Sequence, residues 1–121
     1  MHLKLNLSGH FNKSLAEQGF EFPGIIMIDA EKPYAENLAS VTSFLITLGV
    51  ESNTIVECAL PGMTTLCSMV MVSIHGLTGQ FPLITVTTRN AEGAFEYVET
   101  VDATSLRNEI SRKMRPGLIN L

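Results

Sequence analysis

The stretch "TIVECALPGMTTLCSMVMVSIHG", residues 54–76, joins two apolar runs through one Pro-Gly turn. The first run, 54–60, has the length and β-branched content of a strand, and the turn at 61–62 ends it. The second run, 64–74, is apolar nearly all round, and its length and the following Gly76 favour a buried helix. The stretch therefore predicts a strand–turn–helix unit. It also raises a question: is the turn a phosphate-binding corner or only a structural connection?

Four further runs have the pattern of strands. Leucines alternate strictly with polar residues in "HLKLNL", and the continuous apolar run "GIIMID" is typical of a strand covered on both faces. "AFEYVETV" alternates as an outer, antiparallel strand does, and "RNAEG" before it indicates a hairpin connection. Besides 54–60, we expect strands at 2–7, 24–29, 83–88 and 94–101.

Helical segments separate most of these strands. Apolar residues recur at steps of three and four between 34 and 48, which predicts one amphipathic helix. A last helix is expected at about 104–114, capped by Asp102 or Thr104. The run 13–19 is at most a short helix.

This alternation predicts an α/β fold. We expect a Rossmann-like, mostly parallel sheet with helices on both faces and an antiparallel edge strand. No repeat, low-complexity tract or linker interrupts the chain, so residues 1–121 are expected to form a single domain. In such sheets ligands bind outside the carboxyl ends of the strands.

The composition indicates a folded domain rather than a disordered chain. Of the 121 residues, 45% are hydrophobic and 17% are charged, which is a globular balance. The net charge of −4 argues against general binding to duplex DNA or RNA, because such binding needs a broad basic surface. It leaves room for a small anionic ligand that a few local donors hold.

Several kinds of site have no motif in the sequence. It contains no Walker loop, GxGxxG, GxSxG or zinc-binding cluster, so we expect neither dinucleotide redox chemistry nor nucleoside triphosphate hydrolysis, and no metal or other cofactor. Cys58 and Cys67 lack metal-ligand spacing and are expected to be reduced, buried thiols, which suits the cytosol. The N-terminal residues lack a signal-peptide pattern, and no apolar run approaches the ~20 residues that span a bilayer. We therefore expect a cytoplasmic protein that does not contact membranes.

Three loops follow strands at the edge of the sheet where ligands are expected. They cover residues 8–12, 61–65 and 87–90. In the second loop, N–H groups at the start of the helix and the hydroxyls of Thr64 and Thr65 are able to hold a phosphate, and Gly62 lets a ligand approach the backbone. An equally physical alternative is that the Pro-Gly pair only turns the chain and that Thr64 caps the helix.

Distance along the elements separates the three histidines. His2 lies about 20 Å from this edge at strand spacing. His75 lies about 16 Å from Thr64 along the helix. At that position it can interact favourably with the negative, C-terminal end of the helix dipole. His10 alone stands at the edge, either as a site residue or as an exposed loop residue. Arg89 is the only cation directly after the strand 83–88; it suits a bidentate phosphate contact, or else is a solvated hairpin residue.

Four segments together resemble a known family. They are "LNLSGH", "LPGM", "IHGLTGQFP" and "VETVDATSLRNEISRKMR", and they occur in this order along most of the chain. In this they are similar to the small CRISPR-associated ancillary proteins of the Csx series, fifteenth type, which are found beside type III CRISPR systems. Leu60 and Leu77 depart from the family pattern, in which a proline and a basic residue are expected.

The resemblance implies a Rossmann-like homodimer that binds cyclic oligoadenylate, in particular cyclic tetra-adenylate, across its two-fold axis. Carried over by position, the implied ligand contacts are Ser8, Gly9, His10, Gly62, Met63, Thr64, Thr65 and Arg89. A two-fold pair suits a ring ligand, since each subunit offers the same loops to half of the ring. The apolar helix 64–74 and the C-terminal "GLINL" also predict a homodimer, because so small a domain does not easily cover them.

Three functional hypotheses follow. The leading one is a protein that binds the cyclic oligoadenylate and sequesters it, which regulates type III CRISPR signalling. The second is a metal-independent ring nuclease, in which His10 and Arg89 assist attack of a ribose 2′-hydroxyl on its own phosphodiester. One histidine is a thin catalytic set, although positioning and charge stabilisation alone speed such cleavage. The third is a structural interaction subunit that binds no nucleotide.

Overall fold

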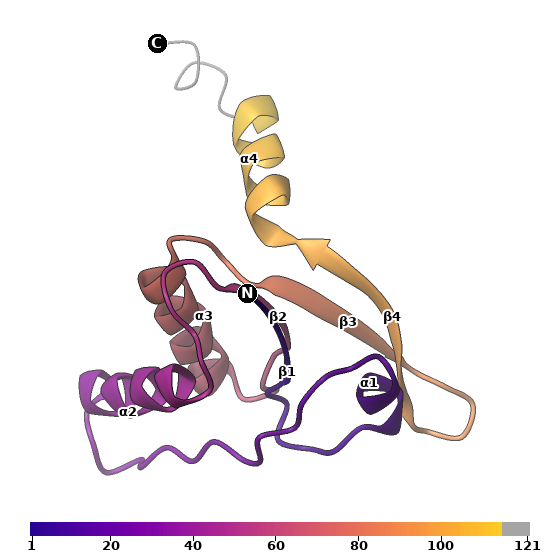
Figure 1. Cartoon of the computed structure of the whole chain (residues 1–121), viewed down its shortest axis with the longest axis horizontal. Helices are drawn as coiled ribbons and strands as arrows, with labels where there is room; N and C mark the ends of the chain where they lie inside the picture. The colour runs from indigo at the N-terminus through magenta and orange to yellow at the C-terminus, as the bar shows by residue number, and fades with distance from the viewer. Residues whose placement is uncertain (115–121) are drawn as a thin grey trace.

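The computed structural model describes residues 1–114 (Figure 1). Four strands and four helices follow one another along this part of the chain. The strands are β1 (His2–Asn6), β2 (Ile55–Ala59), β3 (Leu83–Arg89) and β4 (Phe95–Asp102). The helices are α1 (Lys13–Glu17), α2 (Tyr34–Thr47), α3 (Thr64–Thr78) and α4 (Ala103–Met114). The segment "GLINL", 117–121, from which a homodimer was predicted, lies outside the described residues.

The strands form one sheet in the order β1-β2-β3-β4. β1 pairs with β2 in parallel, and β2 pairs with β3 in parallel. β4 pairs with β3 in the antiparallel direction, with a register shift between Val86 and Thr87. The prediction of a mostly parallel sheet with an antiparallel edge strand is confirmed.

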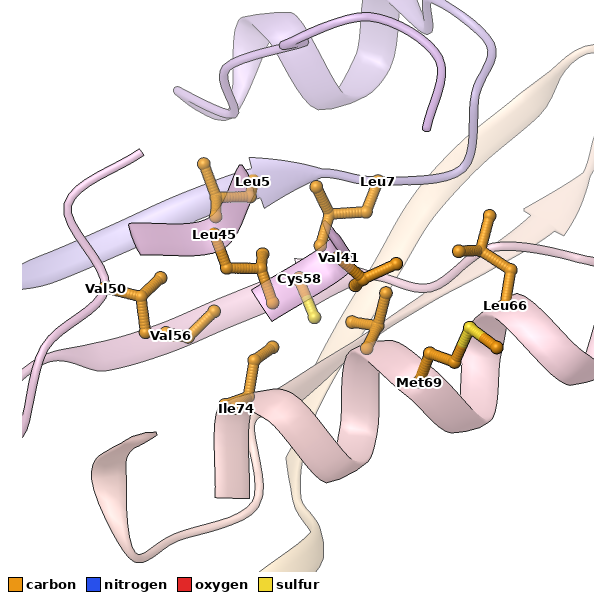
Figure 2. Packing of buried hydrophobic residues seen from close by; sticks show 11 residues of the cluster. Leu5, Leu7, Val41, Leu45, Val50, Val56, Cys58, Leu66, Met69 and Ile74 are labelled. Atoms are coloured by element: carbon orange, nitrogen blue, oxygen red, sulfur yellow. The ribbon is translucent and has the colours of Figure 1, made fainter. Parts of the chain in front are cut away.

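The main core lies between the sheet and the helices α2 and α3. Eleven buried residues form one cluster, and Figure 2 shows their side chains meeting between β1, β2 and these two helices. Cys58 is at its centre, with no exposed surface. Burial raises the pKa of its thiol to about 12, with smaller contributions from Cys67 and Glu57, so Cys58 is a neutral, packed side chain. Cys67 is half-buried, and both cysteines are free.

The other face of the sheet carries α1. Successive residues of a strand point to opposite faces, so Ala59 faces away from Cys58. It packs with Leu15 of α1, Phe20 and, at the margin, Tyr97 of β4. Helices therefore cover both faces, two over β1 and β2 and a short one beside β4.

The predicted strand at 24–29 is wrong. Within the described residues this segment pairs with no strand; Ile26 and Ile28 pack on the core, while Ile25 and Met27 are exposed. Pairing along the free edge of β1 stops early, at a single bridge between Leu5 and Glu21. Pro23 lies two residues after Glu21 and has no N–H with which to continue a ladder.

The segment 24–29 is held instead by a side chain of α2. The amide of Asn37 accepts the N–H of Asp29 at 2.9 Å and donates to its carbonyl at 2.9 Å. The side chain of Asp29 accepts the N–H of Glu31 at 2.9 Å, which is a turn role. An extended chain therefore runs beside the core without belonging to the sheet.

Helix α3 is longer than the predicted 64–74. It continues through Gly76 to Thr78 and ends at Gly79, whose φ of 78° is left-handed. Glycine adopts this conformation without the steric cost that other residues meet, so Gly79 rather than Gly76 ends the helix. Its apolar residues are largely covered by the chain itself, since Leu66, Met69, Val70 and Ile74 are buried.

The last helix begins where expected. The carboxylate of Asp102 accepts the N–H of Ser105 at 3.1 Å and its hydroxyl at 3.1 Å, so Asp102 caps α4. None of the residues of α4 is buried. No helix in the stretch 1–114 has the length and apolarity needed to cross a membrane.

Candidate functional site

A groove opens where β3 separates from β2. The two strands pair at only two positions, Glu57 with Leu83 and Cys58 with Ile84, and the rest of β3 has only β4 beside it. The opening has a volume of about 1170 Å³. Its walls come from the loop after β1, the turn after β2, the β3–β4 hairpin and α1. The groove thus lies at the carboxyl ends of β1 and β2, where the sequence places the site.

The loop after β1 is held in shape by Asn6, which is 1% exposed. Its amide nitrogen donates to the carbonyl of His10 at 2.9 Å. Its amide oxygen accepts the N–H and the hydroxyl of Ser8 at 3.1 and 2.6 Å. Gly9, with φ of 87°, makes the tight turn between them. The hydroxyl of Ser8 is therefore engaged within the loop, so its role is first of all structural.

His10 stands on the wall of this groove. The residue is exposed, and its imidazole makes no hydrogen bond within the described residues. The structure therefore brings Ser8, Gly9 and His10 to the groove together. Asn6 was not identified from the sequence, although the alternation of Leu3, Leu5 and Leu7 places it on the opposite face, two residues before Ser8.

The corner after β2 contributes Pro61, Gly62 and Met63 to the groove. Met63 occupies the N-cap position of α3, and no side chain there accepts a helix N–H. The alternative in which Thr64 caps the helix is therefore wrong. A Cβ added at Gly62 would meet nothing within 4 Å, so the space beside the backbone is open.

The first N–H groups of α3 have no intrahelical acceptor, as at any helix start. The side chains of Thr64 and Thr65 are exposed but do not line the groove. The structure therefore supports a role for the backbone of this corner and not for the two hydroxyls.

The third wall is the β3–β4 hairpin. Thr85 and Thr87 of β3 line the groove, together with Asn90 and residues 94–97. Thr85 is 7% exposed, and its hydroxyl has no hydrogen-bond partner within residues 1–114. A buried, unpartnered polar atom is uncommon in folded proteins. Thr85 thus brings to the groove wall a hydroxyl that residues 1–114 leave without a partner.

Arg89 borders the groove without lining it. Its guanidinium lies over the ring of Phe95 at 5.0 Å from the ring centre, and Phe95 itself lines the groove. Such a contact orients the guanidinium and leaves its N–H donors in solvent. Arg89, the predicted phosphate contact, is therefore adjacent to the groove, with the ring of Phe95 between them.

Two hydrogen bonds join the first and third walls. The amide nitrogen of Asn12 donates to the carbonyl of Phe95 at 3.1 Å, and the hydroxyl of Ser14 accepts the N–H of Tyr97 at 3.0 Å. Asn12 also caps α1 by accepting the N–H of Leu15 at 3.0 Å. These bonds fix the loop after β1 relative to β4.

Large apolar side chains stand exposed around the groove. The exposed fractions are 67% for Phe11, 67% for Ile25, 55% for Met63 and 47% for Phe95, and all four residues line the groove. Exposed apolar residues that gather at one hollow indicate a binding surface. The groove suits a ligand that combines flat apolar rings with polar groups.

Comparisons of the chain with models of protein families, with curated proteins and with solved structures found no match.

The charges of the groove are mixed. Lys13 lines the groove and lies 3.9 Å from Glu17, which also lines it. Glu96 adds a second carboxylate that accepts a hydrogen bond from Asn90 at 2.9 Å. Neither carboxylate was identified from the sequence. Such a wall does not favour duplex nucleic acid, whose binding requires many cations.

The other two histidines lie elsewhere. His2 is 3.5 Å from the carboxylate of Glu57, which Lys4 approaches at 3.9 Å. The ring of His75 lies 4.7 Å from that of Phe81. In the described part of the chain, no three His, Cys, Asp or Glu side chains gather so that they can hold a metal ion.

Proposed function

We propose that the protein binds a cyclic oligoadenylate, cyclic tetra-adenylate, in this groove and sequesters it, thereby lowering a type III CRISPR signal. The observation that carries the proposal is that one groove has both exposed aromatic rings, Phe11 and Phe95, and the uncapped N-terminal N–H groups of α3 after β2. Bases stack on aromatic side chains with about 1–3 kcal/mol per base. Helix N-terminal N–H groups bind phosphate.

The resembling segments support the same ligand. "LNLSGH" and "LPGM" end on two walls of the one groove, although 50 residues separate Ser8–His10 from the turn at 60–63. A Rossmann-like arrangement, which the family implies, also has its ligand at the carboxyl ends of parallel strands. We further propose that the protein is a homodimer, in which two grooves share one ring ligand.

A ring nuclease is the second candidate, and one observation favours it. The imidazole of His10 faces solvent on the same groove that Glu17 lines, so the site holds a second ionisable side chain that is able to act as acid or base. A ribose 2′-hydroxyl would lose its proton and attack the adjacent phosphorus, forming a 2′,3′-cyclic phosphate. The 5′-oxygen would leave and take up a proton.

One experiment separates the two candidates. We expect wild-type protein in excess over labelled cyclic tetra-adenylate to return the ring uncut after long incubation, and His10→Ala to bind it with little loss. Chromatography of the nucleotides is the readout. If wild type opens the ring and His10→Ala binds it but cuts at least a hundredfold slower, as loss of a general acid or base predicts, the nuclease replaces the sequestering protein. If wild type binds no nucleotide, the remaining hypothesis is a structural interaction subunit.

The corner after β2 offers a second test with a matched control. Gly62→Leu projects a side chain into open space in the groove, and Gly76→Leu does the same on the exposed surface of α3. Neither glycine has a positive φ, so both variants should fold. We expect Gly62→Leu to weaken ring binding at least tenfold, about 1.4 kcal/mol, and Gly76→Leu to leave it unchanged. Equal affinity of the two variants would remove the corner from the site.

A further inference from the structure

Helix α4 presents an apolar stripe that residues 1–114 do not cover. Leu106, Ile110 and Met114 are spaced by four residues and so lie on one face of the helix. Their exposed fractions are 47%, 62% and 75%. An amphipathic helix normally buries such a stripe against another element. Within residues 1–114 α4 buries nothing.

The β3–β4 hairpin has an uncovered face as well. Ile84 pairs with Cys58 and therefore faces the side of α2 and α3, and Val86 and Val101 share this face by register. All three are only half-buried, and neither β3 nor β4 contributes to the core cluster under those helices. Both the sheet and its last helix therefore leave apolar surface open.

The helix is unable to cover the hairpin of its own chain. α4 begins at Ala103, directly after the last residue of β4. The hydrogen bonds from Ser105 to Asp102 fix this junction. Figure 1 shows α4 continuing beyond the end of β4 and pointing away from the sheet. To fold back, the chain would have to break the cap and the end of the strand.

The two surfaces carry opposite charge. The hairpin residues 89–102 include four acidic side chains and one basic one, and exposed Glu96 and Glu99 lie on the same face as Val86. α4 includes three basic side chains and one acidic one. By helical spacing Arg107 and Lys113 flank the apolar stripe on its two sides. Opposite potentials across an interface select the partner and its register.

We infer that two copies of this chain exchange their C-terminal helices. The α4 of each copy lies on the uncovered β3–β4 face of the other, its apolar stripe on Ile84, Val86 and Val101, and its flanking cations beside Glu96 and Glu99. The arrangement is isologous, because the same helix and the same hairpin face are used on both copies. This contact is separate from the one that would set two grooves around one ring, because Thr85 and Thr87 line the groove from the opposite face of β3. Glu96, at the end of the hairpin, is the one residue of this contact that also lines the groove.

Sedimentation velocity of the full chain tests the apolar contact. We expect wild type to sediment as two chains across micromolar concentrations and Ile110→Asp as one. Asn108→Asp places the same charge on the opposite side of α4 and should remain a pair. A wild type that sediments as one chain, or an Ile110→Asp that associates as well as Asn108→Asp, overturns the exchange.

Charge reversal tests which surfaces meet. Arg107→Glu with Lys113→Glu makes the helix acidic, and Glu96→Lys with Glu99→Lys makes the hairpin basic. Each double variant alone then opposes like charges and should sediment as single chains. Mixed in equal amounts they should pair, because each helix again meets a hairpin of opposite charge. If the hairpin double variant pairs with itself as wild type does, the hairpin is not the contact and the exchange is wrong.

Discussion

The two halves of this sheet are used differently. β1 and β2, with α2 and α3 over them, contribute to a cluster of eleven buried residues, whereas β3, β4 and α4 contribute none. The half without a core carries the third wall of the groove and the exposed stripe of α4. The buried side chains that stabilise the fold lie between β1, β2, α2 and α3. The surface open to binding lies where β3 separates from β2.

The largest expected effect is on stability in the first half. Leu45→Ala removes a side chain with no exposed surface and should lower the free energy of unfolding by about 2–5 kcal/mol. Val98→Ala, in the exposed part of β4, should change it by no more than about 0.5 kcal/mol. Urea unfolding followed by circular dichroism measures both. Equal losses would mean that the hairpin is as much a part of the core as α2.

The second prediction concerns affinity in the other half. Arg89→Ala should weaken binding of cyclic tetra-adenylate by about 1.5–3 kcal/mol, the range for a hydrogen bond to a charged group, because its donors stand beside Phe95 at the groove. Arg112→Ala removes an equal charge from exposed α4 and should leave affinity unchanged. Titration calorimetry measures both. A loss shared by the two variants would indicate general charge attraction rather than a contact.

The fold was predictable wherever a pattern is local. Alternation in "HLKLNL" and the steps of three and four in α2 gave elements that the structure confirms. The prediction of a strand at 24–29 failed because a side chain of α2, Asn37, holds this segment instead of a neighbouring strand, and such a tertiary contact leaves no local pattern. Gly76 and Gly79 both suit a helix end, and only the backbone decides between them.

The candidate site was predictable by position but not by contact. The rule for parallel sheets placed the loop at Ser8–His10 and the turn at Gly62 on one groove, as the structure has them. Asn6 and Thr85 were missed, because a polar residue within a strand acquires its role only from the neighbours that fold against it. No spacing in the sequence shows which hydroxyl is left without a partner.

The third prediction tests that hidden support. Asn6→Ala removes the hydrogen bonds from its amide to the carbonyl of His10 and from the N–H and hydroxyl of Ser8, so it should lower the free energy of unfolding by about 1–3 kcal/mol. It should also weaken ring binding, since the loop loses its shape. Asn53→Ala, at an exposed position, should change neither quantity. If Asn6→Ala is destabilised but binds the ring with unchanged affinity, the loop after β1 does not contribute to the binding site.

The smallest expected effect on stability is that of Thr85→Val, and its sign is opposite to that of Thr54→Val. Thr85 and Thr54 are 7% and 5% exposed, but only Thr54 uses its hydroxyl, which accepts from Glu51 at 3.0 Å and donates to Gly49 at 3.2 Å. Thr54→Val should therefore lower the free energy of unfolding by about 1 kcal/mol. Thr85→Val replaces an unpartnered hydroxyl by a methyl group of similar shape, so it should be neutral or raise that free energy by up to about 1 kcal/mol.

Ring binding gives the same pair of variants a second readout. A hydroxyl that costs stability in the free protein is explained if the ligand supplies its partner, since residues at a functional site often trade stability for binding. Thr85→Val should then bind cyclic tetra-adenylate more weakly while it unfolds at higher urea, and Thr54→Val should unfold earlier with its affinity unchanged. If Thr85→Val gains stability and keeps full affinity, the hydroxyl does not contact the ring, and the ligand must be held by the loop and corner that face β3 across the groove.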